Sequence, residues 1–410
     1  MSVGAEPLPH RGRPLHPRLL WLLVGVLAVA GIAAAVGWIA FSGGTQATTA
    51  PAPPRVQAEF RALVSGSIPG AILFVRDGGS SYALAAGYAD DVEKVPMRAD
   101  DVFPIGSTTK TYTAVLVMRL AGQGKVELDA PVARYLPDLL PDGDRITVRE
   151  LLSHTSGLYD FATDPRFMAP YLQGKFDFAW TPQQMVGFAT VQPLLFTPGT
   201  RFSYSNTNYV VLALLAERVD GKSYERQLRD YVFRPLGLDH TSLPAGNETL
   251  PDVHGYVGLG AAGKTADATP VDSATLTPSF AWGVGGIRST AEDEADFFRA
   301  LFSGELLPGP QVAAMEDASL AGGAYGLGIM PTGGFEGAWQ SYTKAITTTC
   351  GRAWGHGGAF PGYDQLPISS PDGSRQAVLL VNTDEERLTQ AQYQQVFRVL
   401  ADAYCSGVGP

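Results

Sequence analysis

A serine and a lysine stand three residues apart at the start of an apolar segment of helical length. The four residues are Ser107-Thr108-Thr109-Lys110, and Gly106 precedes them. If the helix begins at Ser107, Lys110 lies one turn further along the same face, where its amine can reach the serine hydroxyl. A buried lysine loses its proton readily, so it can act as the base that makes Ser107 a nucleophile. Taken alone, the four residues also fit an N-capping serine followed by a solvated lysine.

A second copy of the same pattern occurs near the C-terminus, at Ser341-Tyr342-Thr343-Lys344. It runs into residues 345–349, a β-branched stretch that predicts a strand. On a strand, residues three apart point to opposite faces, so Ser341 and Lys344 could not meet. We therefore assign the nucleophile to the first copy.

A tyrosine and an asparagine two residues apart could supply the proton transfers. Tyr204-Ser205-Asn206 follows a Pro-Gly turn at 198–199 and precedes an apolar helix, so we expect it in a loop. A phenol hydrogen-bonded to Lys110 could move the proton between Ser107, the leaving group and a water. Asn206 could bind a substrate amide carbonyl. A half-buried tyrosine and a turn asparagine are the alternative explanation.

Adjacent glycines near the C-terminus indicate a place where something approaches the backbone closely. They lie in Trp354-Gly355-His356-Gly357-Gly358-Ala359, and glycines of this kind weaken a strand unless such an approach requires them. The N–H groups of Ser107 and Ala359 could form an oxyanion hole. His356 could act as a donor or a cation toward a substrate carboxylate; a cation would make KM for acidic substrates rise between about pH 6 and 8. A bulge with a hydrogen-bonded histidine is the alternative.

Together the three motifs resemble those of the penicillin-recognising serine enzymes, specifically the group that holds class C β-lactamases and DD-carboxypeptidases with an H-x-G third motif. The S-x-x-K is Ser107–Lys110, the Y-x-N is Tyr204–Asn206 and the H-x-G is His356–Gly358. Residues 151–158 (LLSHTSGL) are similar to the hinge-region signature of that family, and we expect His154 to hold this turn. The resemblance covers about residues 56–405.

Two neighbouring groups of enzymes do not fit. The class A pattern is absent, because there is no Ser-Asp-Asn loop and Lys264-Thr265-Ala266 has alanine where a K-T-G needs glycine. There is also no G-x-S-x-G elbow, which argues against an α/β-hydrolase.

The resemblance implies a role for each motif residue. Ser107 would be the acylated nucleophile, Lys110 its base partner and Tyr204 the general acid/base. The other implied roles are substrate binding by Asn206, His356 and Gly358, an aromatic wall at Trp282, and an oxyanion hole formed by the N–H groups of Ser107 and Ala359. The implied activity is an exported acyl-enzyme hydrolase.

The preferred substrate is the D-Ala-D-Ala end of peptidoglycan stem peptides or a related D-amino-acid peptide, and a β-lactam would acylate the same serine. An esterase or a β-lactamase on the same scaffold is the alternative among enzymes. A wall-binding or antibiotic-sensing receptor that deacylates slowly is the alternative of another class.

The order of predicted elements favours an α+β fold, in which an antiparallel sheet is flanked by N- and C-terminal helices and carries a mostly helical insert. The α/β part covers about residues 55–105 and 280–405, and the helical part about 106–279. A capping box at Ser289-Thr290-Ala291-Glu292 predicts one further helix, through Leu301. The other expected helices are 56–64, the segment from 107, 147–152, 181–190, 208–219, 224–232 and 388–404. The expected strands are 70–75, 82–86, 325–330, 342–349, 352–359, 363–370 and 375–382.

The N-terminus divides into three parts. Residues 1–18 are polar and arginine-bearing, residues 19–41 form an uncharged apolar run, and residues 42–54 are a Gly/Thr/Ala/Pro linker. A run of roughly 23 residues is long enough to cross a bilayer of about 30 Å as a helix. The arginines should stay cytoplasmic, which predicts a single-pass membrane anchor with an extracellular catalytic domain. A cleaved signal peptide, with Ala40-Phe41-Ser42 as the cleavage site, would instead give a secreted protein.

The bulk properties limit the remaining possibilities. The chain of 410 residues is 45% hydrophobic and carries a formal net charge of −10, so it lacks the basic face that nucleic-acid binding needs. Its two cysteines, Cys350 and Cys405, are expected to form a disulfide outside the membrane, with two buried thiols as the alternative. No His or Cys lies at ligand spacing from either one, so we expect neither a metal nor a cofactor.

Overall fold

The computed structural model describes residues 48–64, 67–244, 248, 253–260, 263–264, 270–333, 346–384 and 387–407. The predicted tail, the predicted membrane span and residues 42–47 of the predicted linker lie outside these residues. Within the described ranges, no helix has both the length and the apolar character that a membrane crossing requires.

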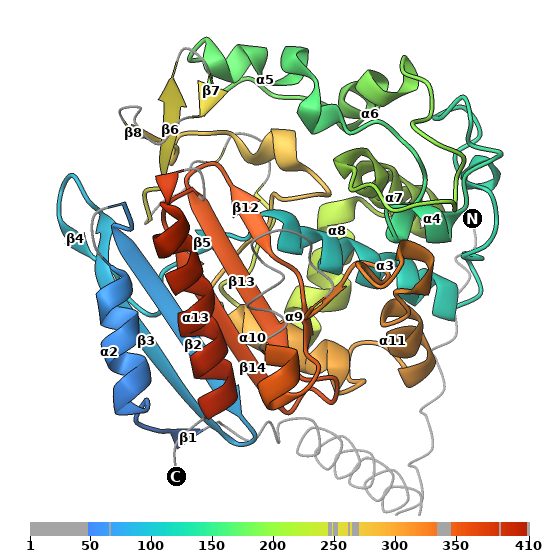
Figure 1. Ribbon diagram of the computed structural model, residues 1–410. Coiled ribbons are helices and arrows are strands. Elements are labelled where there is room, and N and C mark those ends of the chain that lie inside the picture. The colour runs from blue at the N-terminus through green and yellow to red at the C-terminus, as the bar shows by residue number, and fades with distance from the viewer. Residues whose placement is uncertain are drawn as a thin grey trace, which may run out of the picture. The chain divides into compact units, whose positions relative to one another are not determined.

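A mostly antiparallel sheet combines strands from the first and last parts of the described chain (Figure 1). In this sheet β2 (Gly70–Asp77) lies between β3 (Ser80–Asp90) and β14 (Arg375–Val381), and β14 pairs with β13 (Tyr363–Ser369). The order over the described residues is β1-β3-β2-β14-β13-β11-β10, in which the short β1 (Thr48–Thr49) runs parallel to β3. The expected antiparallel sheet is therefore confirmed.

Helices from opposite ends of the chain cover one face of this sheet. They are α2 (Pro54–Leu63) and α13 (Gln390–Ser406), which pack against each other and against the sheet. Because successive side chains of a strand point to opposite faces, β2 contributes to two cores. Its Leu73 packs under α2 and α13, whereas its Ile72 joins the larger core on the other face. There α10 (Ala291–Phe302) lies against β2, β13 and β14.

The middle of the chain is mostly helical. Two of its helices, α3 and α7, pack against each other, and nearly every residue of α3 is buried, as expected for a helix inside a core. The helices of this part are α3 (Thr109–Gly122), α4 (Val148–Leu152), α5 (Pro165–Leu172), α6 (Pro182–Thr190), α7 (Asn206–Asp220), α8 (Tyr224–Leu228) and α9 (Arg234–Leu236).

Three of the expected strands were wrong in extent or type. The strand expected at 325–330 is reduced to β10 (Met330–Pro331), and the one at 352–359 is divided into β11 (Trp354–Gly355) and β12 (Gly358–Phe360). Residues 346–350 form a helix instead of the end of strand 342–349. Tertiary packing overrides β-propensity here, because Ile346 is buried in the core beneath α13. The rejected serine–lysine copy at 341–344 lies outside the described residues.

The start of α10 also differs by one residue from the expected capping box. The capping residue is Thr290, whose side chain accepts a hydrogen bond from the N–H of Asp293 at 3.2 Å. Ser289 instead belongs to β9 (Arg288–Ser289), which pairs with β5 (Phe103–Pro104) just before the nucleophile segment. Because Ser289 pairs with Phe103 of β5, the N-cap of α10 falls one residue later, at Thr290.

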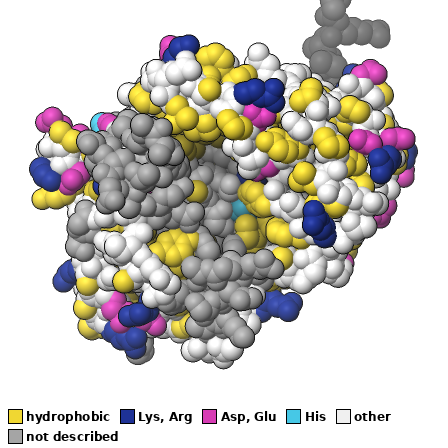
Figure 2. All heavy atoms as spheres, turned by 45° about the horizontal axis from the view of Figure 1, so that its top comes forward, with side chains coloured by type: hydrophobic (Ala, Val, Ile, Leu, Met, Phe, Trp, Pro, Cys, Tyr) yellow, Lys and Arg dark blue, Asp and Glu magenta, His cyan; other side chains and the backbone are white. Residues whose placement is uncertain are grey.

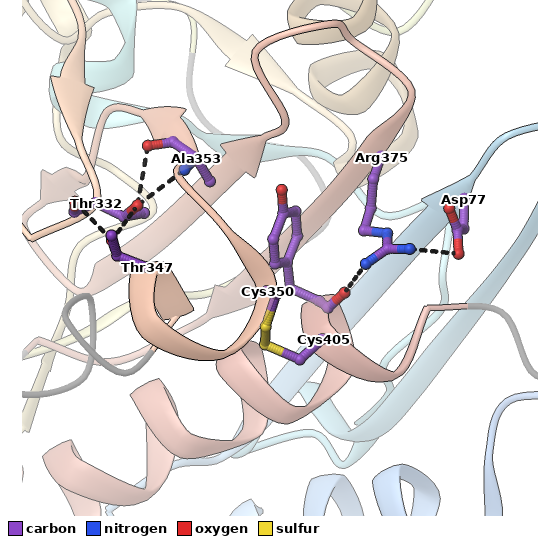
Figure 3. Close-up of a disulfide and its surroundings, with 8 residues drawn as sticks. Asp77, Thr332, Thr347, Cys350, Ala353, Arg375 and Cys405 are labelled. Carbon is purple, nitrogen blue, oxygen red and sulfur yellow. Dashed lines mark hydrogen bonds and ion pairs between the residues drawn. A yellow bond between two sulfur atoms is a disulfide. The ribbon is translucent and has the colours of Figure 1, made fainter.

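A disulfide joins Cys350 to Cys405, as predicted, with 5.4 Å between the two Cα atoms. Figure 3 shows it linking the 346–350 helix to the C-terminal turn of α13. Beside it, Arg375 of β14 pairs with Asp77 of β2 at 3.0 Å. Arg375 also donates to the carbonyl of Tyr404 at 3.5 Å, and this bond joins the last turn of α13 to the sheet.

Candidate active site

The nucleophile segment enters α3 through a 3-10 turn, Gly106–Thr108. Gly106 has a φ of +47°, and a side chain there would come within 2.5 Å of the backbone of Ala359. On the other side, a side chain at Gly358 would meet the carbonyl oxygen of Ile105. Glycines at both positions therefore let β12 cross directly beside Ser107. This close approach brings the main chains of Ser107 and Ala359 together, as an oxyanion hole requires.

A polar network behind this crossing holds the two segments. The hydroxyl of Thr108 donates to the carbonyl of His356 at 2.6 Å, and the side-chain amide of Gln365 donates to Thr108 Oγ1 at 2.6 Å and to the carbonyl of Ile105. Gln365 lies on β13 opposite Gly358. The sheet is thus tied to the start of the nucleophile helix.

Lys110 reaches the nucleophile. Its Nζ lies 2.9 Å from Ser107 Oγ and donates to the carbonyl of Val284 at 2.9 Å. The side chain is fully buried. Burial lowers the pKa of Lys110 to about 7, although the nearby carboxylate of Asp160 raises it. A large share of this amine is therefore neutral at physiological pH and can accept the serine proton.

Tyr204 approaches Ser107 from the segment before α7. Its hydroxyl forms a side-chain hydrogen bond with Ser107, and its ring centroid lies 5.0 Å from the Nζ of Lys110. Burial raises the pKa of Tyr204 above its usual value, and the bond to Ser107 opposes this. Tyr204 therefore stays a neutral phenol that can give a proton to a leaving group.

His154 forms the platform under Tyr204. The two rings stack with 4.2 Å between centroids. The Nδ1 of His154 lies 3.2 Å from the backbone N of Ser205, which donates to it, and 3.1 Å from Nδ2 of Asn208. Burial lowers the pKa of His154 well below its usual value, so the ring is neutral. As expected from the LLSHTSGL segment, this histidine holds the turn.

Asn206 opens α7 and faces the cavity beside Ser107. Its backbone N donates to Asp160 Oδ1 at 3.1 Å, and its side-chain Nδ2 lies 3.0 Å from Asp160 Oδ2. An amide nitrogen carries two N–H donors, so one can remain for a substrate carbonyl. Sequence reasoning missed Asp160, because its relation to Asn206 exists only in three dimensions.

His356 lies deeper than a substrate-binding cation would. Its Nδ1 lies 2.6 Å from the carbonyl of Gly357 and its Nε2 lies 2.8 Å from the hydroxyl of Tyr325. The side chain is 1% exposed, and burial together with the charge of Lys110 lowers its pKa to about 3. Of the two forms that the sequence left open, a donor or a cation, burial therefore favours the neutral ring, and both ring nitrogens of His356 already have partners within the protein.

Trp282 does not form the expected aromatic wall. Its Nε1 donates to Glu225 at 2.8 Å and its ring packs on Tyr224. The cavity wall is formed instead by Phe280, two residues earlier, which stacks on Phe360 with 5.2 Å between centroids. The family resemblance pointed to Trp282, and nothing in the local sequence pointed to Phe280.

The cavity beside Ser107 has a volume of about 190 Å³. Figure 2, in which the top of Figure 1 is turned forward, shows the surface hollowed near its centre, with hydrophobic side chains along part of the rim. The large side chains that line the cavity are mainly aromatic: Phe161, Phe167, Met168, Phe280 and Phe360. In the described part of the chain, no group of three His, Cys, Asp or Glu residues could hold a metal ion.

A serine next to a buried amine and a phenol, with two main-chain segments crossing beside it, is the arrangement of a serine hydrolase. The comparisons with known proteins agree. The chain belongs to the beta-lactamase family, whose model matches residues 56–401.

Among curated proteins, the chain is 31% identical over 313 residues to penicillin-binding protein 4 of Amycolatopsis lactamdurans, covering 75% of each. Among solved structures, it is similar to a D-stereospecific amidohydrolase from Streptomyces sp., with a TM-score of 0.73 and 31% identity over 85% of this chain and 98% of the other. A D-amino acid amidase from Ochrobactrum anthropi SV3, in complex with L-phenylalanine amide, has a TM-score of 0.69 and 28% identity over 84% and 96%.

Proposed function

We propose that this serine hydrolase cleaves amides or peptides of D-amino acids whose acyl residue carries a large apolar side chain. The observation that carries the proposal is the aromatic cavity beside Ser107. The names of its relatives, a D-stereospecific amidohydrolase and a D-amino acid amidase, support the D configuration and the amide bond.

The position of the cavity supports its assignment to the acyl side of the substrate. The leaving group must lie next to its proton donor, Tyr204, which is not among the residues that line the cavity. Asn206 and Ala359 do line it, together with Ser107. A substrate whose carbonyl lies over Ser107 would thus place its leaving group toward Tyr204 and its acyl side chain among the phenylalanines.

The reaction follows from the protonation states. Neutral Lys110 takes the proton of Ser107 as Oγ bonds to the carbonyl carbon, and the N–H groups of Ser107 and Ala359 stabilise the oxyanion. When the bond to the leaving nitrogen breaks, Tyr204 gives it a proton and regains one from Lys110. Water then attacks the acyl ester, and its proton returns through the same groups to release the acid and restore Ser107.

A substrate panel on the purified protein tests this proposal. D-phenylalanine amide should have a kcat/KM at least tenfold above that of D-alanine amide, because burying an aromatic side chain is worth about 1.5–3 kcal/mol. Phe280→Ala should reduce this ratio about tenfold, whereas Trp282→Ala, the matched control, should leave it unchanged. Equal rates for D-phenylalanine amide and D-alanine amide would refute the proposal, and so would equal rates for D- and L-phenylalanine amide. Full activity in Ser107→Ala would also refute it.

A D-Ala-D-Ala carboxypeptidase is the second candidate, favoured by the likeness to a penicillin-binding protein. It predicts that peptides ending in D-Ala-D-Ala turn over faster than D-phenylalanine amide. An esterase would prefer p-nitrophenyl esters to every amide in the panel. A slow-deacylating receptor would retain penicillin on Ser107 for hours in a time course of intact mass, whereas a β-lactamase would lose it within seconds.

We also infer that the catalytic domain is exported and tethered by residues 19–54, because the apolar run follows an arginine-bearing segment. Protease added to intact cells should then digest the domain while leaving a cytoplasmic marker whole. Recovery of the full-length chain from the soluble cytoplasmic fraction would contradict this topology.

A further inference from the structure

Asp160 touches the catalytic machinery at Asn206. It follows the LLSHTSGL turn and caps the 3-10 turn Phe161–Thr163 through a hydrogen bond from the N–H of Ala162 to its Oδ1 at 3.1 Å. The same carboxylate accepts from both the backbone N and the side-chain Nδ2 of Asn206. One half-buried carboxylate thus joins the loop below the cavity to the first residue of α7.

We propose that Asp160 is a positioning residue that fixes the side-chain amide of Asn206 in the orientation needed to bind substrate. The amide can face the carboxylate only with its nitrogen, because a flipped amide would place Oδ1 against the anion. The carboxylate also lies at the N-terminus of α7, a 15-residue helix whose partial positive charge favours it. This inference rests on the proposed function only in that Asn206 must contact the substrate.

The loop does not depend on this carboxylate alone. The carbonyl of Tyr159 accepts from the hydroxyls of Ser205 at 3.2 Å and Thr207 at 2.7 Å, and the N–H of Phe161 donates to Thr207 at 3.2 Å. These three bonds hold the segments on either side of Asp160 and Asn206. Removing the charge of Asp160 should therefore leave the fold intact while freeing the amide of Asn206.

The charge of Asp160 also acts on Lys110, and this effect distinguishes a positioning role of Asp160 from a merely structural one. Among the described groups that influence the pKa of Lys110, Asp160 is the charged one, since His154 and His356 are neutral and Tyr204 is a phenol. Its negative charge raises the pKa of Lys110. Without it, Lys110 should lose its proton at lower pH, and the acid limb of the rate profile should move the same way.

The test compares the wild type with Asp160→Asn, Asn206→Ala and the double variant, using both N-acetylglycine p-nitrophenyl ester, which carries an amide carbonyl for Asn206, and D-phenylalanine amide. Asp160→Asn should lower kcat/KM about ten- to a hundredfold, the range expected for a lost charged hydrogen bond. In the Asn206→Ala background the same change should cost less than threefold, because residues that act as a unit are not additive. Asp372→Asn, in the distant β13–β14 turn, is the control and should be neutral.

Three results would overturn the proposal: additive losses in the double variant, an Asp160→Asn enzyme within twofold of wild type, or an acid limb that does not move to lower pH. A loss confined to substrates with a free α-amino group would also overturn it, because it would make Asp160 a substrate contact. Melting temperatures of all variants should agree within a few degrees. Because the ester reports on Ser107 without a D-amino acid, failure of the substrate assignment would not imitate any of these results.

Discussion

Acylation should depend on pH with a midpoint near 7, because Lys110 must be neutral to accept the proton of Ser107. An ordinary lysine, with a pKa of 10.5, would be neutral in only about one molecule in 3,000 at pH 7. With the pKa lowered to about 7, roughly half of the molecules carry the free amine. Burial of this one side chain therefore raises the active fraction about a thousandfold.

The assay is kcat/KM for a p-nitroanilide substrate measured from pH 5 to pH 9. We expect a plateau above about pH 8 and a tenfold fall per pH unit below about pH 6. The histidines should not produce this limb, because the pKa of His356 is lowered to about 3 and that of His154 is also far below its usual value. The limb therefore reports on the lysine.

Lys110→Arg supplies the control for this prediction, because a guanidinium keeps its charge throughout the range. On the plateau above about pH 8 it should lose at least about a thousandfold in kcat/KM, and its profile should show no limb near 7. A rate that is flat from pH 5.5 to 8.5 in the wild type would refute the reasoning. So would an arginine variant that retains a tenth of the wild-type activity.

Three further outcomes are expected. Lys110→Met should be more stable than the wild type by up to about 4 kcal/mol at pH 7. The unfolded lysine keeps its proton up to about pH 10.5, whereas the folded one releases it near pH 7, so wild-type stability rises across this window. Urea denaturation should therefore show the difference in unfolding free energy between the two proteins closing toward pH 10. A constant gap would contradict the burial argument. Gly358→Ala should reduce the rate of acylation about 10²- to 10³-fold in a burst assay, because the added methyl group meets the carbonyl of Ile105 and moves β12 away from Ser107. An unchanged burst rate would contradict this prediction. Breaking the disulfide between Cys350 and Cys405, which are 55 residues apart in the sequence, should lower the free energy of unfolding by roughly 4 kcal/mol with little effect on kcat. An unfolding midpoint that is unchanged by reductant would disprove this prediction.

The sequence by itself determined the features that depend on near neighbours. The spacing of Ser107 and Lys110 places them one turn apart once the segment is helical. Two short apolar segments, at 70–75 and 82–86, indicated the strands β2 and β3. The family resemblance of three short motifs supplied the class of enzyme, and the chain's two cysteines could be paired without structural information.

Only the tertiary structure decided which side chains surround the nucleophile. Phe280 and Trp282 are equally aromatic and two residues apart, but only Phe280 faces the cavity, because the loop that carries them packs between β12 and α8. His356 is neutral because the fold buries it against Tyr325, and Asp160 matters because the chain brings it to Asn206 across 46 residues. Burial and distant contact set charge and orientation, and neither is encoded in the local pattern of residues.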